Sequence, residues 1–294
     1  DDLVAALGVD SGISKSEVSR ICAGLDREIE AFRSRTLTHT QFPYVFADAT
    51  FCKVRVGAHV VSQALVVATG VSIEGTREVL GTAVGDSESF EFWREFLASL
   101  KARGLAGVHL VISDAHAGLK SAVAQQFSGS SWQRCRAHFM RNLHGAVSAK
   151  HAPAVTAAVK TVFAHTDPDE VAAQWDTVAD SLAASFPKVA AMMNEAKADV
   201  LAFTAFPRAH WQKIWSNNPI ERLNKEIKRR ADVVEIFPNP AAFLRLATAV
   251  VIEAHDEWQV TRRYLSEISM AELRKVIAAK QTAEKPVAEQ LQIA

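Results

Sequence analysis

Hydrophobic and polar positions follow two different periods along this chain. Apolar residues dominate three consecutive segments, 44–56, 58–69 and 71–84, which glycines separate. Strand-like runs joined by short glycine-containing turns predict an antiparallel meander. A shorter apolar run at 108–112 is typical of a buried strand, and it lies between two segments with helical spacing. Strands followed by alternating strand and helix predict an α/β fold in which helices cover a mixed sheet.

Helical spacing dominates the remainder of the sequence. We expect one helix capped by Ser87 and ended at Gly104, and a second that follows Asp114 and runs through Phe127. Residues 136–210 are rich in alanine, and their helical spacing is interrupted at prolines. This stretch predicts a long, all-helical insertion in the α/β pattern.

Two more helices are predicted after the insertion. One runs from Asn218 to Arg230, and the other begins after Pro240 and continues through Trp258. Pro219 fits the first helical position, which makes Asn218 the expected N-cap.

The start of the chain predicts short helices. Ser14 and Glu17 have the spacing of a capping box, with which a new helix begins. Lys15 and Arg20 in its first turns would suit entry into a major groove, so a helix-turn-helix and a solvated helical linker are both open interpretations.

The predicted organisation has five parts. They are a short helical segment at 1–37, a core in two pieces at 38–135 and 211–270, a helical insertion at 136–210, and a polar tail at 271–294, which we expect to fray after Lys280.

Composition narrows the class of protein. The 294 residues include 33 basic and 33 acidic side chains, so any nucleic-acid surface has to be a local patch. Cys22, Cys52 and Cys135 are too few and too widely spaced for a disulfide framework, which favours a reducing compartment and a cytoplasmic location. No apolar run approaches the ~18 residues of a membrane span, and no secretory signal begins the chain. Because residue 1 is not Met, we expect a processed form or a fragment of a longer protein.

Three carboxylates stand at positions suited to a common site. Asp48 interrupts an apolar strand, and Asp114 directly follows the strand at 108–112. Strand ends are where sites collect in open α/β sheets. Glu221 lies in the first turn of the helix that begins near Asn218. Each has an ordinary alternative: a hydrogen-bonded strand residue for Asp48, a helix N-cap for Asp114 and a capping residue for Glu221.

Glu226 is the rival carboxylate on the same helix. Five residues at ~100° each turn it about 140° away from Glu221. There we expect Glu226 to pair with Arg222 and Arg230, while Glu221 shares its face with Lys225.

Three ionised carboxylates brought together repel one another unless a cation lies between them. Carboxylate oxygens suit Mg²⁺, with Mn²⁺ as a substitute. A pair of such ions supports an in-line phosphoryl transfer, so phosphodiester chemistry is the expected use of this site.

Four motifs occur along the chain in a characteristic order. They are Asp48-Ala49-Thr50, Ser113-Asp114-Ala115-His116, Arg134-Cys135-Arg136-Ala137-His138 and the long run from Ser216 to Arg230. With the segments 81–105, 237–239 and 255–258, they resemble the Mutator-type transposases of bacterial insertion sequences over about residues 2–270. The run 218–230 is highly specific, whereas Asp-Ala-Thr alone is weak.

The resemblance implies a ribonuclease H-like mixed sheet flanked by helices, with Asp48, Asp114 and Glu221 as an acidic triad that is both catalytic and metal-binding. Asp48 and Asp114 are 66 residues apart, and Asp114 and Glu221 are 107 residues apart, intervals that suit the family. The implied activity is Mg²⁺-dependent DNA strand cleavage at the ends of the element, followed by strand transfer to target DNA.

The chain departs from the family pattern at a few places. Family members carry more chain before this start, where terminal-repeat binding is expected, so we interpret 1–37 as the remnant of a DNA-binding region. Asn217 stands where Thr is more usual, and Cys52 stands where an aromatic residue is more usual. Neither is expected to touch a ligand.

A surplus of positive charge follows Glu221, which favours a phosphate-facing patch over a merely solvated helix face. Trp211 and Trp215 just before it either stack on an unpaired base or belong to the core. The predicted DNA-binding residues are Arg134, Arg136, His138, Arg141, Arg222, Asn224, Lys225, Lys228, Arg229 and Arg230.

Cys135 and His138 match a Cys-x-x-His element of the family. Zn²⁺ needs about four ligands, and His109, His116 and His144 stay open as partners. A structural or DNA-positioning role for His138 is favoured over zinc, and a plain buried Cys135 is the simplest alternative.

The function class therefore has three candidates. The first is an active transposase on double-stranded DNA, working as a homodimer or larger assembly in the nucleoid, with no membrane partner. The second is an idle or truncated transposase that acts as a DNA-binding protein. The third is a nuclease on the same core, which would cut without joining.

Overall fold

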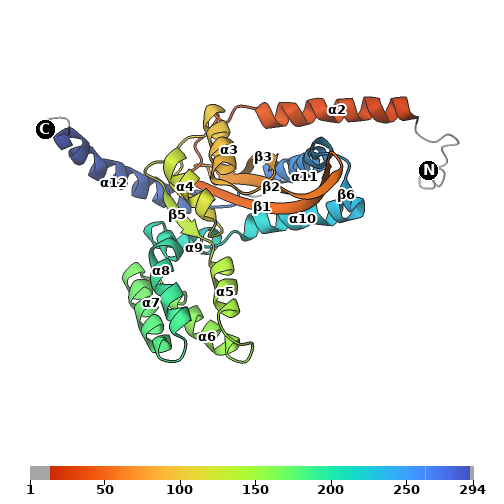
Figure 1. Cartoon of the computed structure of the whole chain (residues 1–294). Coiled ribbons are helices and arrows are strands. Elements are labelled where there is room, and N and C mark those ends of the chain that lie inside the picture. The colour runs from red at the N-terminus through yellow and green to blue at the C-terminus, as the bar shows by residue number, and fades with distance from the viewer. Residues whose placement is uncertain (1–13, 262, 292–294) are drawn as a thin grey trace.

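The computed structural model describes residues 14–261 and 263–291, and its centre is a six-stranded mixed sheet (Figure 1). The strands are β1 (Tyr44–Val56), β2 (His59–Val71), β3 (Arg77–Gly85), β4 (Leu110–Ser113), β5 (Ser131–Arg134) and β6 (Ile236–Phe237). Five of them follow the order β3-β2-β1-β4-β5, and β6 pairs with β1. Strand β2 is antiparallel to β1 and β3, whereas β4 runs parallel to β1 and to β5. The predicted meander and the mixed α/β class are confirmed.

Helices carry most of the remaining described chain. They are α2 (Lys15–Ser34), α3 (Phe90–Ala102), α4 (Ala117–Gln126), α5 (Arg136–Gly145), α6 (Ala152–Val162), α7 (Pro168–Ala183), α8 (Pro187–Val200), α9 (Trp211–Ile214), α10 (Asn218–Val234), α11 (Pro240–Val260) and α12 (Glu267–Leu291), with 3-10 turns at Ala202–Ala205 and Arg208–His210. Helices α5 to α8 form a lobe below the sheet, and α2 and α12 extend from opposite ends of the body (Figure 1). Among the described residues, no helix is both long and apolar enough to span a membrane.

The sheet is covered on both faces. Helices α3 and α4 bury Trp93, Leu97 and Leu119 against one face, together with Val45 and Ala47 of β1. Helices α10 and α11 pack on the other face through a separate apolar cluster. Successive side chains of a strand point to opposite faces of the sheet. The residues of β1 that alternate with Val45 and Ala47 therefore point to the face on which α10 and α11 pack.

The helical lobe has its own apolar centre, which continues onto the sheet. Trp175 of α7 stacks on Phe139 of α5 at 5.6 Å between ring centroids, and its indole N–H donates to the Met193 carbonyl at 3.1 Å. The prolines that interrupt the sequence of this stretch lie in the first turns of α6, α7 and α8. A proline there removes no intrahelical hydrogen bond, so these residues begin helices.

Serine side chains cap two of the helices. The capping box of Ser14 and Glu17 at the start of α2 is confirmed. Ser89, and not Ser87, caps α3, because the Ser89 hydroxyl is the one that accepts the Phe92 N–H. The short strands β5 and β6 were not predicted, and the helix expected before residue 14 lies outside the described residues.

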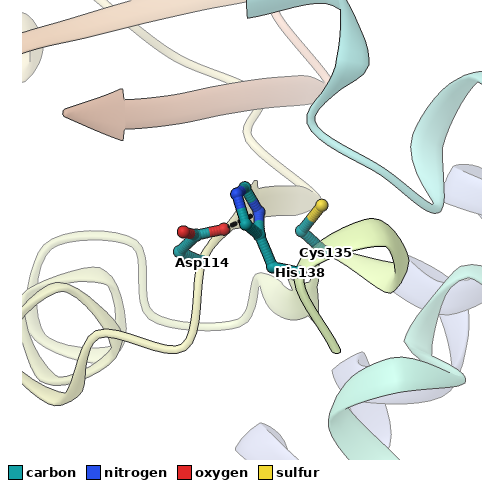
Figure 2. Close-up of side chains that lie close together, drawn as sticks. All are labelled: Asp114, Cys135 and His138. Atoms are coloured by element: carbon teal, nitrogen blue, oxygen red, sulfur yellow. Dashed lines mark ion pairs between the residues drawn. The ribbon is translucent and has the colours of Figure 1, made fainter. Parts of the chain in front are cut away.

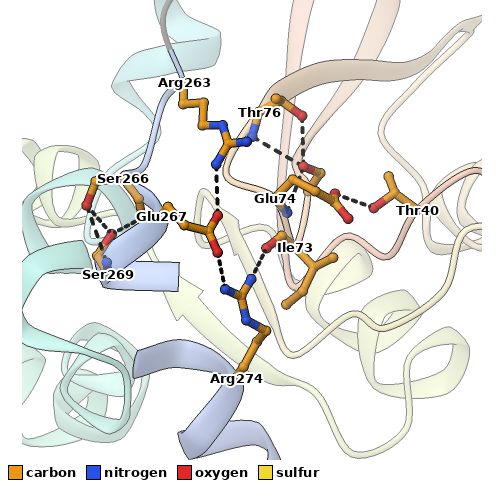
Figure 3. Close-up of polar contacts among 10 residues, drawn as sticks. Thr40, Ile73, Glu74, Thr76, Arg263, Ser266, Glu267, Ser269 and Arg274 are labelled. Carbon is orange, nitrogen blue, oxygen red and sulfur yellow. Dashed lines mark hydrogen bonds and ion pairs between the residues drawn. The ribbon is translucent and has the colours of Figure 1, made fainter. Parts of the chain in front are cut away.

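The fraying expected after Lys280 differs from the structure, which continues α12 as a helix through Leu291. The start of α12 is fastened to the turn between β2 and β3 (Figure 3). The Arg274 guanidinium donates to the Ile73 carbonyl at 3.1 Å, and the Leu265 N–H donates to the Gly75 carbonyl at 3.1 Å. Gly75 has a φ of 84°, and a Cβ there would collide with the Leu265 carbonyl oxygen, so only glycine fits this contact.

Candidate active site

Asp48 lies within β1, on the side of the strand that faces α10. Its carboxylate accepts a hydrogen bond from the Asn224 side-chain amide, with Oδ2 and Nδ2 2.7 Å apart. Burial, and after it the nearby charge of Asp114, raise the pKa of Asp48 to about 7. The positive charge near this carboxylate is therefore too small to offset the cost of ionising it in a buried position.

Asp114 follows β4 directly, and the pairing of β4 with β1 brings it towards Asp48. Phe46 pairs with Ile112 in parallel register, and two residues further along each strand stand Asp48 and Asp114. The alternative of Asp114 as a helix cap is wrong, because His116 caps α4 by accepting a backbone N–H with its ring.

Glu221 lies in the first turn of α10, whose predicted apolar stripe is buried against the sheet. The helix begins at Asn218, and its N-cap is Asn217, one residue before the predicted cap. Asn224 stands one turn after Glu221 and contacts Asp48. One end of α10 thus supplies a carboxylate to the site and a hydrogen-bond donor to the carboxylate on β1.

His138 lies between two of the carboxylates. Its Nδ1 forms an ion pair with Asp114 Oδ1 (Figure 2), and its Nε2 lies 3.6 Å from Glu221 Oε1. Arg141, one turn later on α5, lies 3.2 Å from the same Glu221 oxygen. Burial alone would lower the pKa of His138, but its pairing with Asp114 and Cys135 outweighs burial and raises the pKa to about 10. A cationic His138 therefore offsets the repulsion between the acids.

Asn217 connects the segments that carry these groups. Its side-chain amide donates to the Ala47 carbonyl at 3.0 Å, directly before Asp48. Its backbone N–H donates to Cys135 Sγ at 3.2 Å. Sequence reasoning discounted Asn217 because it is not a ligand, although its departure from the more usual Thr was the one available signal.

The cations near α5 differ in how far they are free to meet DNA. Arg136 lies over the Trp215 ring, 4.1 Å from its centroid, and Arg134 lies 5.0 Å from the centroid of a buried phenylalanine ring. Trp211 is only 2% exposed, so the core interpretation holds for it. Arg141 has 61% of its side chain exposed, which leaves most of its guanidinium in solvent.

The predicted pair of Glu226 with Arg230 is confirmed, and its second partner is Arg229 in place of Arg222. Glu226 pairs with Arg229 at 2.7 Å and with Arg230 at 2.9 Å, and Arg230 also contacts Glu253 of α11 at 2.5 Å. Hydrogen bonds from these two arginines lower the pKa of Glu226 to about 2. The expected pair with Arg222 is wrong, because an acid placed N-terminal to its base along a helix is better oriented than the reverse.

The remaining predicted DNA contacts on α10 point in different directions. Lys225 and Lys228 are exposed, and no ion pair involves either of them in the described part of the chain. Asn224 is only 8% exposed and is engaged with Asp48, so it belongs to the interior of the site.

The histidines considered as partners of Cys135 and His138 are engaged elsewhere where their contacts are described. His116 caps α4, and His144 contacts a threonine of α6. Asp114 is the residue that the fold brings to the Cys-x-x-His element.

Comparison with known proteins shows which family the chain is similar to. The family described as "Transposase, Mutator family" matches residues 1–261. The transposase for insertion sequence element IS1081 of Mycobacterium tuberculosis is 44% identical over 288 residues, which cover 98% of this chain and 68% of that protein.

Other relatives come from different bacteria. The transposase for element ISRM5 of Rhizobium meliloti is 36% identical over 263 residues, 90% of this chain and 66% of that protein. The transposase for IS256 in transposon Tn4001 of Staphylococcus aureus is 36% identical over 257 residues, 86% of this chain and 66% of that protein. The chain spans about two thirds of the length of these relatives. On these matches, the chain belongs to the Mutator family of transposases.

Proposed function

We propose that this transposase cuts DNA at the ends of an insertion sequence and joins the freed strand to target DNA, with Asp48, Asp114 and Glu221 as ligands of divalent cations. The observation that carries the proposal is the convergence of these carboxylates from β1, the end of β4 and α10 upon one region, with His138 between two of them. Nothing in a purely structural role calls for uniting acids from three separate elements.

The sheet supports a ribonuclease H-like core. Its order is β3-β2-β1-β4-β5, and β2 is the strand that runs against its neighbours. One of the proposed acids, Asp48, lies within β1, and another, Asp114, directly follows the adjacent, parallel strand β4. Polar groups at the ends of such strands are the usual site of chemistry in open α/β sheets.

The residues fit a hard divalent cation. All the proposed ligand atoms are carboxylate oxygens, which Mg²⁺ and Mn²⁺ prefer. The raised pKa of Asp48 indicates that its ionised form lacks counter-charge, which a divalent cation would supply. Bound to these carboxylates, two such ions would activate the attacking oxygen and stabilise the leaving oxygen of an in-line displacement.

The chain itself orients the proposed ligands. Asn224 holds one oxygen of Asp48 at 2.7 Å, and Arg141 holds one oxygen of Glu221 at 3.2 Å. His138 keeps Asp114 and Glu221 at fixed positions on either side of its ring. Ligands that are already held in position need less rearrangement before reaction. A functional site generally requires such support from neighbouring side chains.

DNA would approach over the exposed cations beside the site. Arg141, Lys225 and Lys228 are exposed, and phosphate contacts of this kind supply affinity without sequence preference. Because two ends of an element must be processed together, we propose that a homodimer or larger assembly forms on DNA.

The test is cleavage of a labelled duplex that carries one end of the insertion sequence, in Mg²⁺, by the whole chain. We expect Asp48→Asn, Asp114→Asn and Glu221→Gln each to lower the cleavage rate by at least about 100-fold, because a lost metal ligand removes several kcal/mol of stabilisation. The matched control is Glu226→Gln, which removes a carboxylate from the same helix and should leave the rate within about threefold of the unmodified chain. DNA affinity should change little in the three variants at Asp48, Asp114 and Glu221.

The same assay contains the outcomes that overturn the proposal. DNA binding without cleavage by the unmodified chain would indicate a DNA-binding protein, and cleavage without strand joining would indicate a nuclease. Cleavage retained by any one of the three variants would remove that residue from the proposed ligand set.

A further inference from the structure

Asp114 belongs to a second group of side chains, which it forms with Cys135 and His138. A carboxylate oxygen, the thiol sulfur and an imidazole nitrogen of this group all lie within 4.8 Å of one another (Figure 2). We propose that these side chains bind Zn²⁺ or a similar thiophilic cation, and that an ion held there withdraws Asp114 from the proposed Mg²⁺ ligands and inhibits DNA cleavage.

The donor set distinguishes this group from the three carboxylates. A thiolate and an imidazole are ligands that Zn²⁺, Co²⁺ and Cd²⁺ take readily, whereas Mg²⁺ is held by oxygen. Cys135 is the N-cap of α5, and His138 follows in the first turn. The rigid start of one helix thus presents the sulfur and the nitrogen, and the loop after β4 presents the oxygen.

The surroundings match those of metal-bound histidines and cysteines. A histidine that binds a metal through one ring nitrogen usually donates the other ring N–H to a carboxylate. In this group Nδ1 faces Asp114, and Nε2 lies 3.6 Å from Glu221 Oε1. The Asn217 N–H donates to Cys135 Sγ at 3.2 Å, a contact that would stabilise the thiolate.

The group also offers room for an ion to arrive. Cys135 is fully buried, but the side chains of His138 and Asp114 are 20% and 40% exposed. Apart from their mutual ion pair, His138 Nδ1 and Asp114 Oδ1 have no hydrogen-bond partner among the described residues. An ion that separated these two atoms would therefore break no other hydrogen bond.

Metal binding and inhibition of cleavage, the two parts of the proposal, rest on different observations. Binding of a thiophilic cation needs only the geometry of Asp114, Cys135 and His138. Inhibition rests in addition on the proposed function, because it requires that Asp114 serve the Mg²⁺-dependent reaction.

Binding is tested with the whole chain, without Mg²⁺, by titration with Co²⁺ and with Zn²⁺. Co²⁺ should produce the near-ultraviolet absorption of a cobalt–thiolate bond, and Zn²⁺ should bleach it. We expect Cys135→Ser to abolish this band and to weaken Zn²⁺ binding in calorimetry by at least about tenfold, while its hydroxyl can still accept the Asn217 N–H. The control is Cys52→Ser, which removes a half-buried cysteine of β1 away from the group and should leave both signals unchanged.

The outcomes separate the two proposals. Absence of the cobalt–thiolate band in the unmodified chain overturns the binding site, whatever the fold of Cys135→Ser. If the unmodified chain cleaves DNA in Mg²⁺, added Zn²⁺ should suppress cleavage, and the ratio of rates with and without Zn²⁺ should rise in Cys135→Ser. An equal ratio in both chains overturns the inhibition. A chain that shows the band but never cleaves DNA contradicts the proposed function and supports the metal site.

Discussion

Asn217 donates its side-chain amide to the backbone carbonyl of Ala47 at 3.0 Å, and so ties the start of α10 to the strand residue directly before Asp48. The backbone N–H of the same asparagine donates to Cys135 at the start of α5. A fully buried side chain thus fixes the relative positions of the elements that carry Asp48, His138 and Glu221.

We expect Asn217→Ala to destabilise the chain by about 1–2 kcal/mol, because a buried backbone carbonyl loses its partner. The substitution should also weaken Mn²⁺ binding, since Asp48 and Glu221 lose their shared anchor. Urea unfolding and calorimetric titration with Mn²⁺ measure these two effects. Asn218→Ala, at the exposed neighbouring position, should change neither quantity. Equal Mn²⁺ affinity in Asn217→Ala would show that the anchor does not matter for the ligands.

Asp48 makes the metal-free chain less stable as the pH rises. Its pKa is about 7 in the folded chain, above its ordinary value of 3.8, so the folded state holds this proton more tightly than the unfolded state. The associated stability is complete below about pH 4 and is lost as the pH rises through about 7. Burial and the charge of Asp114 are the physical causes.

Asp48→Asn should therefore stabilise the metal-free chain at about pH 8 by something on the order of 2 kcal/mol, because the amide does not ionise. The Asn224 amide can still donate to the new side chain. Urea unfolding in the presence of a chelator measures the difference, and Asp232→Asn, an exposed acid of α10, is the control. A loss of stability in Asp48→Asn at this pH would contradict the assigned cause.

The cations of α10 should divide by their ion pairs when DNA affinity is measured. Lys225 and Lys228 are exposed without an acidic partner in the described chain, whereas Arg229 and Arg230 are paired with Glu226. We expect the double substitution of both lysines by Gln to lower DNA affinity and to reduce the slope of log affinity against log salt by about 2, because about one counterion is released per phosphate contact.

The corresponding substitution of Arg229 and Arg230 by Gln is the matched comparison, since it removes equal formal charge from the same helix. It should change the salt dependence less. Titration of a labelled duplex at several salt concentrations measures both slopes, and identical slopes for the two double variants would refute the division.

Local patterns in the sequence were enough to predict the elements that carry the acids. The alternation around Phe46 and the apolar stripe of α10 each arise because one face of the element is buried. Buried positions carry apolar residues, so the period of these residues predicts the element. Strand β5 was missed because its Ser131–Arg134 segment is short and mixed in polarity. Its place in the sheet depends on pairing with β4, which is a tertiary contact.

The interior of the site could not be predicted in the same way. His138, Asp114 and Glu221 lie on three elements that are distant in sequence, so no spacing rule predicts that they are in contact. The contacts of Asn217 follow no spacing rule either, because its partners are a backbone carbonyl and a sulfur. The pairing of Glu226 with Arg229 was within reach, since helix geometry alone favours that orientation.

His210 should make the chain sensitive to acid. Its ring is fully buried, with Nδ1 2.7 Å from the Tyr44 hydroxyl, and Nε2 has no hydrogen-bond partner in the described residues. Burial lowers the pKa of His210 to about 4, so the unfolded state binds this proton first as the pH falls. The stability that depends on a neutral His210 is complete above about pH 6.5 and is lost as the pH falls through about 4, a change on the order of 2 kcal/mol.

In His210→Gln, which retains a hydrogen-bonding group for Tyr44, the free energy of unfolding should fall less over the same interval. Urea unfolding at both ends of the interval gives this double difference, and His144→Gln, at an exposed histidine, should behave like the unmodified chain. Parallel pH profiles for the unmodified chain and His210→Gln would mean that acid destabilises the chain through other groups.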